Sequence, residues 1–348
     1  MSLPTGIRSY NYAQDMAVFR TRAHWVWLGV LLAFLFTGPL YWGNYWLGVA
    51  NLIGITIIAA IGLNILTGYC GQLSIGHAGF IAVGAYTAAV LTNRLEMPFL
   101  VGLICAGLSS GLVGMVFGIP SLRVKGFYLA ISTIAAQFII IWVINHWTGV
   151  TGGFNGMSVP PAQIGRLTFV TQASQFYLIT IIVIIVVFLA KNLSRTRAGR
   201  AFVAIRDNDL AAQVMGINLF RYKLLAFFIG CFLAGVAGSL FAHWTGFLNA
   251  ENFTIMDSIL YIGMIIIGGL GTTVGPIFGV LFIRLLQQLI TKIAPVMEGA
   301  LPNLPAGFTT GIGPMVFGIA IILFLILEPR GLAHRWSLVR ASYRLWPF

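Results

Sequence analysis

The sequence predicts an all-α fold, a polytopic bundle of membrane-spanning helices, from three observations. Apolar residues make up 59% of the 348 residues and charged residues only 8%, whereas soluble domains carry about 25% charged residues. Nearly uncharged stretches such as Leu47–Leu66 and Tyr222–Phe241 reach the roughly 20 residues that a helix needs to cross the bilayer. None shows sustained alternation of apolar and polar residues, so an outer-membrane barrel fits poorly. We expect a single transmembrane domain over residues 1–348.

About ten membrane segments follow one another along the chain. The polar amino terminus, Met1 to Ala23, precedes a first apolar stretch with no clearly placed small-residue cleavage site. We therefore expect that stretch to be retained as a span and not removed as a signal peptide. The expected segments are 25–42, 47–67, 77–93, 99–119, 126–147, 176–190, 222–243, 255–270, 274–293 and 311–327.

Two glycine-rich joints, Gly68–Gly76 and Gly268–Gly275, interrupt this series. They are either turns between spans or breaks within re-entrant or discontinuous helices, because transporters unwind glycine-interrupted segments beside a cavity. Each follows an apolar run, and the two lie about 200 residues apart. An internal repeat is therefore a further hypothesis.

Small residues recur at helical spacing in several spans. The pairs are Gly107/Gly111, Gly114/Gly118, Gly230/Ala234 and Ala234/Gly238. Lipid supplies no hydrophobic drive for helix association, so such pairs indicate close packing within the subunit or against a partner. Cys70, Cys105 and Cys231 lie far apart in apolar sequence, which favours buried structural cysteines over a disulfide framework or a metal site.

The positive charges predict the orientation. With the amino terminus inside, the cytoplasmic segments hold every lysine and arginine except Arg94, Arg166, Arg284 and Lys292, as the positive-inside rule requires. Both termini are then cytoplasmic in a bacterial inner (plasma) membrane, with a periplasmic loop at 148–175 and a cytoplasmic tail at 328–348. The net charge of +12 therefore indicates contact with the lipid bilayer and gives no reason to expect nucleic acid.

Acidic residues are scarce in the spans. None lies between Asp15 and Glu96, and only Asp257 falls near a span, whereas carriers driven by protons or sodium usually place carboxylates at membrane depth. A phosphate-cradling Gly-x-x-x-x-Gly-Lys-Ser/Thr loop is absent from the sequence, as is a His and Asp cluster typical of a membrane-embedded enzyme. An autonomous secondary carrier or channel is thus disfavoured, and energy must come from another polypeptide.

The segment Lys191–Lys223 forms the one sizeable cytoplasmic connection. It contains Phe202, Ile205, Leu210 and other apolar residues, so we expect it to be folded. Asp207 or Asn208 would cap a short helix that ends at Gly216. This helix would either dock into a groove of a soluble partner or lie on the membrane with its basic residues on anionic headgroups, and the sequence favours neither.

This segment resembles the coupling loop in the membrane subunits of bacterial ABC importers, where Glu-Ala-Ala is followed three residues later by Gly. Ala211, Ala212 and Gly216 match that spacing, but Leu210 replaces the acidic residue and Asp209 precedes it. The usual downstream Leu-Pro is also missing. Within that group the chain resembles the branched-chain amino acid permeases, and their second, larger membrane subunit more than the first. The stretches that carry this resemblance are Gly62–Tyr86, Gly126–Ala135, Thr151–Met157, Ala198–Gly216 and Phe253–Gly279.

The resemblance implies a transporter subunit without enzymatic activity or cofactor of its own. Its partners would be a second related permease, two cytoplasmic ATP-binding subunits that hydrolyse ATP, and a periplasmic solute-binding protein that docks on residues 148–175. The substrates would be branched-chain amino acids; urea, short amides and other small polar solutes remain alternatives. Coupling to the ATPases would involve Arg200, Arg206, Asp207, Asp209, Ala211, Ala212 and Gly216.

Polar residues around the first joint are candidates for a translocation path. Asn64, Gln72, Ser74 and His77 would line that path or satisfy backbone groups freed at the joint. Further candidates are Tyr128, Asn155 and Asp257, and Asp257 would alternatively form an ion pair with Arg284 or lie at the membrane interface, with Arg284 bound to backbone carbonyls.

The first spans leave little charge with which to bind a zwitterion tightly. Between Ile53 and Ile119 the charged residues are only Arg94 and Glu96, at an expected outer turn. We therefore expect a hydrated, weakly binding path, with the affinity supplied by the external binding protein.

Overall fold

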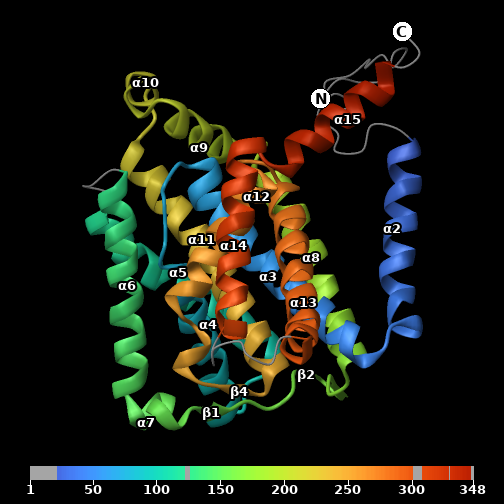
Figure 1. Cartoon of the computed structure of the whole chain (residues 1–348). Helices are drawn as coiled ribbons and strands as arrows, with labels where there is room; N and C mark the ends of the chain where they lie inside the picture. The colour runs from blue at the N-terminus through green and yellow to red at the C-terminus, as the bar shows by residue number, and fades with distance from the viewer. Residues whose placement is uncertain (1–21, 122–125, 301–307, 329, 346–348) are drawn as a thin grey trace.

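The computed structural model describes residues 22–121, 126–300, 308–328 and 330–345. The amino-terminal residues up to 21, the basic pair Arg123 and Lys125, and the last three residues of the expected tail lie outside the described residues. Long helices run side by side between two ends of the molecule (Figure 1). We call them the α9 end, at the top of Figure 1, and the β1 end, at the bottom.

Helices dominate the described residues, which confirms the predicted all-α class, and each strand is only two residues long. The long helices are α2 (Arg22–Tyr41), α3 (Asn44–Leu63), α4 (His77–Arg94), α5 (Phe99–Ser121), α6 (Phe127–His146), α8 (Gln172–Leu193), α11 (Leu219–Thr245), α13 (Gly275–Ala300) and α14 (Phe308–Leu327). The shorter elements are η1 (Asn64–Tyr69), α7 (Thr148–Thr151), η2 (Gly153–Asn155), α9 (Arg197–Asp207), α10 (Asp209–Val214), η3 (Ala250–Asn252), α12 (Ile255–Gly268) and α15 (Leu332–Leu345).

Among the described residues, seven helices are long and apolar enough to cross a membrane, or eight if Gly313–Leu327 and Leu332–Val339, bent by 45°, form one span. The sequence predicted about ten. The apolar part of α2, Trp25–Tyr41, is shorter than the length required of a span. Helix α4, which the sequence predicted as a span, is not among the seven. It is rich in alanine, glycine and threonine and packs against α5, α6 and α11, so few of its side chains need to face lipid.

Helix α11 lies at the centre of the bundle and packs against α3, α4 and α5. Gly84 of α4 faces Gly235 of α11 so closely that a Cβ atom on Gly84 would overlap the Gly235 backbone. Gly107 and Gly111 of α5 lie against phenylalanine rings of α11. The predicted small-residue pairs therefore pack helices within the subunit.

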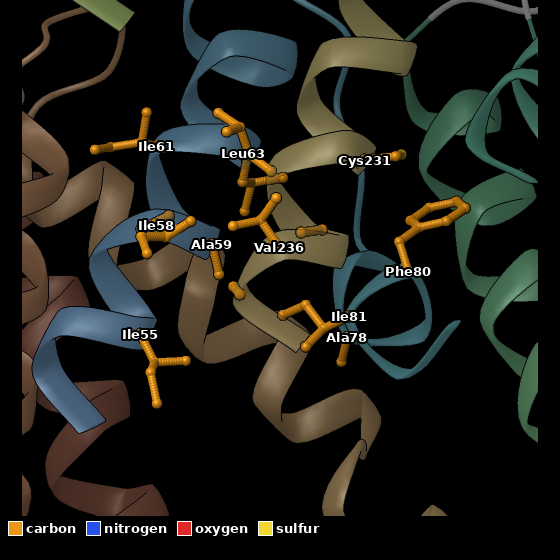
Figure 2. Close-up of a cluster of buried hydrophobic side chains, with 14 of the residues drawn as sticks. Ile55, Ile58, Ala59, Ile61, Leu63, Ala78, Phe80, Ile81, Cys231 and Val236 are labelled. Atoms are coloured by element: carbon orange, nitrogen blue, oxygen red, sulfur yellow. The ribbon is translucent and has the colours of Figure 1, made fainter. Parts of the chain in front are cut away.

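Apolar side chains fill the space around this contact. Figure 2 shows Ile58 and Leu63 of α3, Phe80 of α4 and Val236 of α11 in one buried cluster. Cys70 and Cys231 are buried and unpaired, as predicted, whereas Cys105 is half-buried. We call the packed helices α3, α4, α5 and α11 the central core.

Residues 148–175 are folded at the β1 end. After α7 and η2, strand β1 (Met157–Ser158) pairs antiparallel with β4 (Phe247–Leu248), and β2 (Gln163–Ile164) pairs with β3 (Leu167–Thr168). Val159 and Ala162 are buried. The β1–β4 pair therefore fixes this loop to the end of α11.

Candidate coupling segment and translocation path

The segment between α8 and α11 folds into two short helices with well-formed ends. The Thr196 side chain caps α9 by accepting a hydrogen bond from the backbone N–H of Gly199 at 3.2 Å. The Asn208 side chain caps α10 in the same way, with the N–H of Ala211 at 3.0 Å. Gly216 follows α10 with a left-handed φ of 85°, and the N–H of Ile217 donates to the Ala212 carbonyl at 3.0 Å. The predicted cap and stop are thus confirmed.

Helices α9 and α10 differ in what they bury. Phe202 and Ile205 of α9 are buried against the bundle. On α10 only Ala212 is buried, while Leu210, Val214 and, just after the helix, Met215 are 67%, 88% and 82% exposed. Helix α10 lies at the extreme α9 end of the molecule (Figure 1). Exposed apolar side chains grouped in this way are typical of a contact surface.

Charged groups tie this segment to the bundle. Asp209 of α10 forms an ion pair with Lys223 of α11 at 3.8 Å, and Lys223 is only 7% exposed. Arg200 is exposed and donates to the Arg195 carbonyl at 2.7 Å, a local contact. Of the predicted coupling residues, Asp209 holds the segment through this ion pair and Ala212 through its buried side chain.

Arg206, in the last turn of α9, joins this segment to both glycine-rich joints. Its Nη1 donates to the Gly68 carbonyl at 3.0 Å, and Nε and Nη2 donate to Asp207 Oδ1 at 2.9 and 2.8 Å. Gly71 and Gly271 lie directly against its side chain, with φ values of 71° and 70°. One arginine therefore contacts residues about 200 positions apart in the chain.

Asn64 links the two joints to each other. Its Nδ2 donates to the Thr272 carbonyl at 2.8 Å, and its Oδ1 accepts from the N–H of Gly271 at 2.9 Å. Asn64 is 1% exposed and begins η1, a π-helical turn. It therefore satisfies backbone groups freed at the second joint and not at its own.

A cavity of about 360 Å³ opens beside these contacts. Gln72 lies on its wall and is 7% exposed, with its Nε2 donating to the Cys70 carbonyl at 3.3 Å. The wall combines residues of the first joint, α6, α9, α10 and α11. They include Cys70, Gly71, Leu129, Ile205, Arg206, Asp209 and Lys223.

Ser74 and His77 are fully buried between helices. The Nε2 atom of His77 lies 3.0 Å from the Ala59 carbonyl oxygen, and its ring packs edge-on against Tyr261. Within the described part of the chain, the Ser74 hydroxyl and His77 Nδ1 have no hydrogen-bond partner. Buried polar groups without partners are costly, so these two atoms are the unsatisfied groups of the path candidates.

The other three path candidates are not among the residues that line the cavity beside Arg206. Tyr128 is 71% exposed at the start of α6, and Asn155 is exposed in η2 at the β1 end. Asp257 accepts from the backbone N–H and the hydroxyl of Thr254 in a capping box at the start of α12. The structure therefore gathers Asn64 and Gln72 near Arg206, with Ser74 and His77 next along the chain. Tyr128 lies beside the same cavity, between the lining residues Gly126 and Leu129, but its side chain is not part of the wall. Asn155 and Asp257 lie at other places.

Asp257 and Arg284 do not form the ion pair that the sequence left open. Arg284 donates to Thr56 Oγ1 from Nη2 at 2.9 Å and to Gln287 Oε1 from Nη1 at 2.9 Å. These are side-chain acceptors and not the backbone carbonyls that the sequence suggested. Both charged residues nevertheless line one cavity.

The connection through Arg206 was missed at the level of the sequence. The only signals were the similar composition of the two joints and their expected location on the same side of the membrane. In the described residues, no group of three or more His, Cys, Asp and Glu side chains is placed to hold a metal ion.

The helical bundle and the folded segment at its α9 end define a multi-pass membrane permease. A family model described as "Branched-chain amino acid transport system / permease component" matches residues 45–325. The chain belongs to this family of ABC permeases.

Several curated proteins are similar to this chain. The "High-affinity branched-chain amino acid transport system permease protein LivM" of Escherichia coli K12 is 31% identical over 76% of this chain and 68% of its own length. The "Probable branched-chain amino acid transport permease protein LivM" of Methanocaldococcus jannaschii is 24% identical over 80% of this chain and 90% of its own length. The "Autoinducer 2 import system permease protein LsrC" of Enterobacter sp. is 27% identical over 72% of this chain and 67% of its own length. No solved structure matches the chain.

Proposed function

We propose that this chain imports branched-chain amino acids across a bacterial inner membrane as one permease subunit of an ABC importer. The observation that carries the proposal is the contact of Arg206 with both glycine-rich joints. It connects a segment with an exposed apolar surface to the backbone turns beside the cavity. The family and its LivM members support the substrate class.

The α9 end is the cytoplasmic side in this proposal. Lys191, Arg195, Arg197, Arg221 and Lys223 belong to the helices and turns of this end, whereas Arg94, Arg166 and Lys292 belong to the β1 end. The positive-inside rule then makes both chain termini cytoplasmic and residues 148–175 periplasmic. The folded periplasmic loop would receive the solute-binding protein.

One of the two cytoplasmic ATPases would dock on α10 through Leu210, Val214 and Met215. Hydrolysis of ATP belongs to these partners, and a second, related permease completes the path. When the ATPases close, α10 and α9 move, and Arg206 carries the movement to the backbone at Gly68 and Gly271. The unpaired atoms Ser74 Oγ and His77 Nδ1 would gain water or solute as partners when the path opens.

The direct test is transport by the purified complex of this permease, its sister permease, the two ATPases and the binding protein in proteoliposomes. We expect ATP-dependent uptake of labelled leucine and no uptake of labelled urea. If the complex takes up urea but not leucine, the transported solute is urea and not a branched-chain amino acid. If leucine enters without any ATPase, the protein is an autonomous carrier or channel.

A further inference from the structure

A second cavity, of about 280 Å³, lies among α3, α4, α11, α12 and α13. Ile55, Ile81 and Phe241 form apolar parts of its wall, and Asp257, Tyr261 and Arg284 bring polar groups to it. Small-molecule sites commonly combine a mostly apolar wall with a few polar groups that fix orientation. The ligand that this cavity could bind therefore depends on which hydrogen-bonding atoms of Asp257 and Arg284 are not engaged by the protein.

Arg284 keeps hydrogen-bonding capacity. A guanidinium has five N–H donors, and Thr56 and Gln287 together engage three of them, at 3.2, 2.9 and 2.9 Å. Tyr261 also interacts with Arg284, which still leaves at least one donor. These neighbours fix the position of the guanidinium without neutralising its charge.

Only one of the two carboxylate oxygens of Asp257 accepts hydrogen bonds from the described residues. Its Oδ2 accepts from the Thr254 backbone N–H at 3.0 Å and from the Thr254 hydroxyl at 2.6 Å. Among the described residues, no hydrogen bond engages Oδ1, and no basic side chain forms an ion pair with Asp257. The cavity therefore holds one cation and one anion on neighbouring helices, and neither neutralises the other.

A ligand with both charges and a branched apolar side chain would complement these features. Its carboxylate would accept from Arg284, its ammonium would donate to Asp257, and its side chain would pack on the apolar wall. Each ion of the ligand would then keep a partner after losing water, which otherwise costs several kcal/mol. Urea has neither charge and would gain neither contact.

We propose that this cavity is a transient site for a zwitterionic α-amino acid on the translocation path, with the carboxylate at Arg284 and the ammonium at Asp257. The site rests on the proposed import function and names where its substrate is held. Binding is weak, because Thr56, Gln287 and Thr254 already engage most of the hydrogen-bonding atoms of Arg284 and Asp257 and leave few for the ligand. Arg284 and Asp257 come from spans outside Ile53–Ile119, where the sequence offers no such charges.

The test uses the assembled complex with Arg284→Gln, Arg284→Lys and Asp257→Asn. Asparagine keeps an oxygen for Thr254, and lysine keeps the positive charge. Lys292→Gln is the matched control, because it removes the same charge from α13 at a position away from this cavity. At saturating binding protein, we expect Arg284→Gln and Asp257→Asn to lower the maximal leucine uptake rate about tenfold or more. Arg284→Lys should lose less, and Lys292→Gln should match the wild type.

A second readout separates ligand contact from a purely structural role. Saturation-transfer NMR on the complex without binding protein, with leucine and with leucinamide at millimolar concentration, should favour leucine in the wild type. Arg284→Gln should abolish that preference, because leucinamide lacks the carboxylate. Wild-type uptake together with an unchanged preference in the variants would overturn the site alone. A wild-type complex that transports no leucine would overturn the proposed function, and this site with it.

Discussion

The central core and the α9 end of the molecule are held together in different ways. In the core, helices meet at glycines such as Gly84 and Gly235, with no room for a single added carbon atom. At the α9 end, Arg206 and Asn64 connect irregular backbone through hydrogen bonds beside a cavity of about 360 Å³. Packed backbones resist displacement, whereas joints with positive φ values absorb changes in direction. We therefore expect movement at the joints, with the core as their support.

The largest effect is expected from a substitution in the core. Gly235→Leu would drive a side chain into the backbone of Ala106, and neither helix can yield without losing its packing. We expect almost no folded protein in the membrane, measured by size-exclusion chromatography of a fluorescent fusion. Gly318→Leu in α14 is the control, because a Cβ atom there meets nothing within 4 Å. Normal accumulation of Gly235→Leu would show that the core is not tightly packed.

Breaking the link at the α9 end should remove transport without removing the protein. Arg206→Ala loses the hydrogen bond to Gly68 and the contact with Gly271. We expect leucine uptake to fall about tenfold or more, since charge-assisted hydrogen bonds contribute roughly 1.5–3 kcal/mol. Insertion and co-purification with the ATPases should be normal. Arg197→Ala, an exposed position on the same helix, should transport like the wild type, and equal losses in both variants would point to charge alone.

Gly216 provides a smaller and more local effect. Its φ of 85° is unfavourable for a β-branched residue, whereas asparagine tolerates this region better. Gly216→Val should therefore reorient α10, weaken ATPase binding and lower uptake several-fold, with insertion unchanged. Gly216→Asn should retain most of the uptake. ATPase co-purification and leucine uptake measure both variants, and indistinguishable results for valine and asparagine would exclude the backbone explanation.

The smallest effect is expected at Tyr128. Its side chain is 71% exposed and is not part of the wall of the cavity beside Arg206, although Gly126 and Leu129 on either side of it are. Tyr128→Ala should change the leucine uptake rate by less than about twofold, because substitutions away from packed or bonded sites are usually mild. Gln72→Ala, which alters the cavity wall, is the comparison. If Tyr128→Ala lowers the leucine uptake rate more than Gln72→Ala does, Tyr128 is part of the translocation path.

The sequence predicted the features that depend on local chemistry. Asn208 caps the start of α10 and Gly216 follows its end, as predicted, because caps and left-handed glycines act within a few residues. Apolar length identified most of the spans. Helix α4 is less apolar than the other predicted spans and is not among the seven, since a helix enclosed by others needs little apolar surface of its own.

The contacts that define the candidate site could not be predicted in this way. Arg206 and Gly68 are 138 residues apart, and Asn64 and Thr272 are 208 apart. Their proximity depends on how whole helices pack, which a periodicity within one segment does not contain. For the same reason, the sequence did not distinguish Asn155 from Asn64, although Asn155 lies at the β1 end and Asn64 contacts the second joint.

The central claim is that the second joint moves with the coupling segment while the core stays fixed. The direct measurement is a pair of spin-label distances in the reconstituted complex, with and without ATP. One pair joins Leu270, in the joint, to Leu108 on α5, and the other joins Leu108 to Trp46 on α3, within the core; all three side chains are exposed. We predict that ATP changes the first distance and not the second, and that Arg206→Ala removes the change. An unchanged Leu270–Leu108 distance in the wild type, or the same change in Arg206→Ala, would contradict the account.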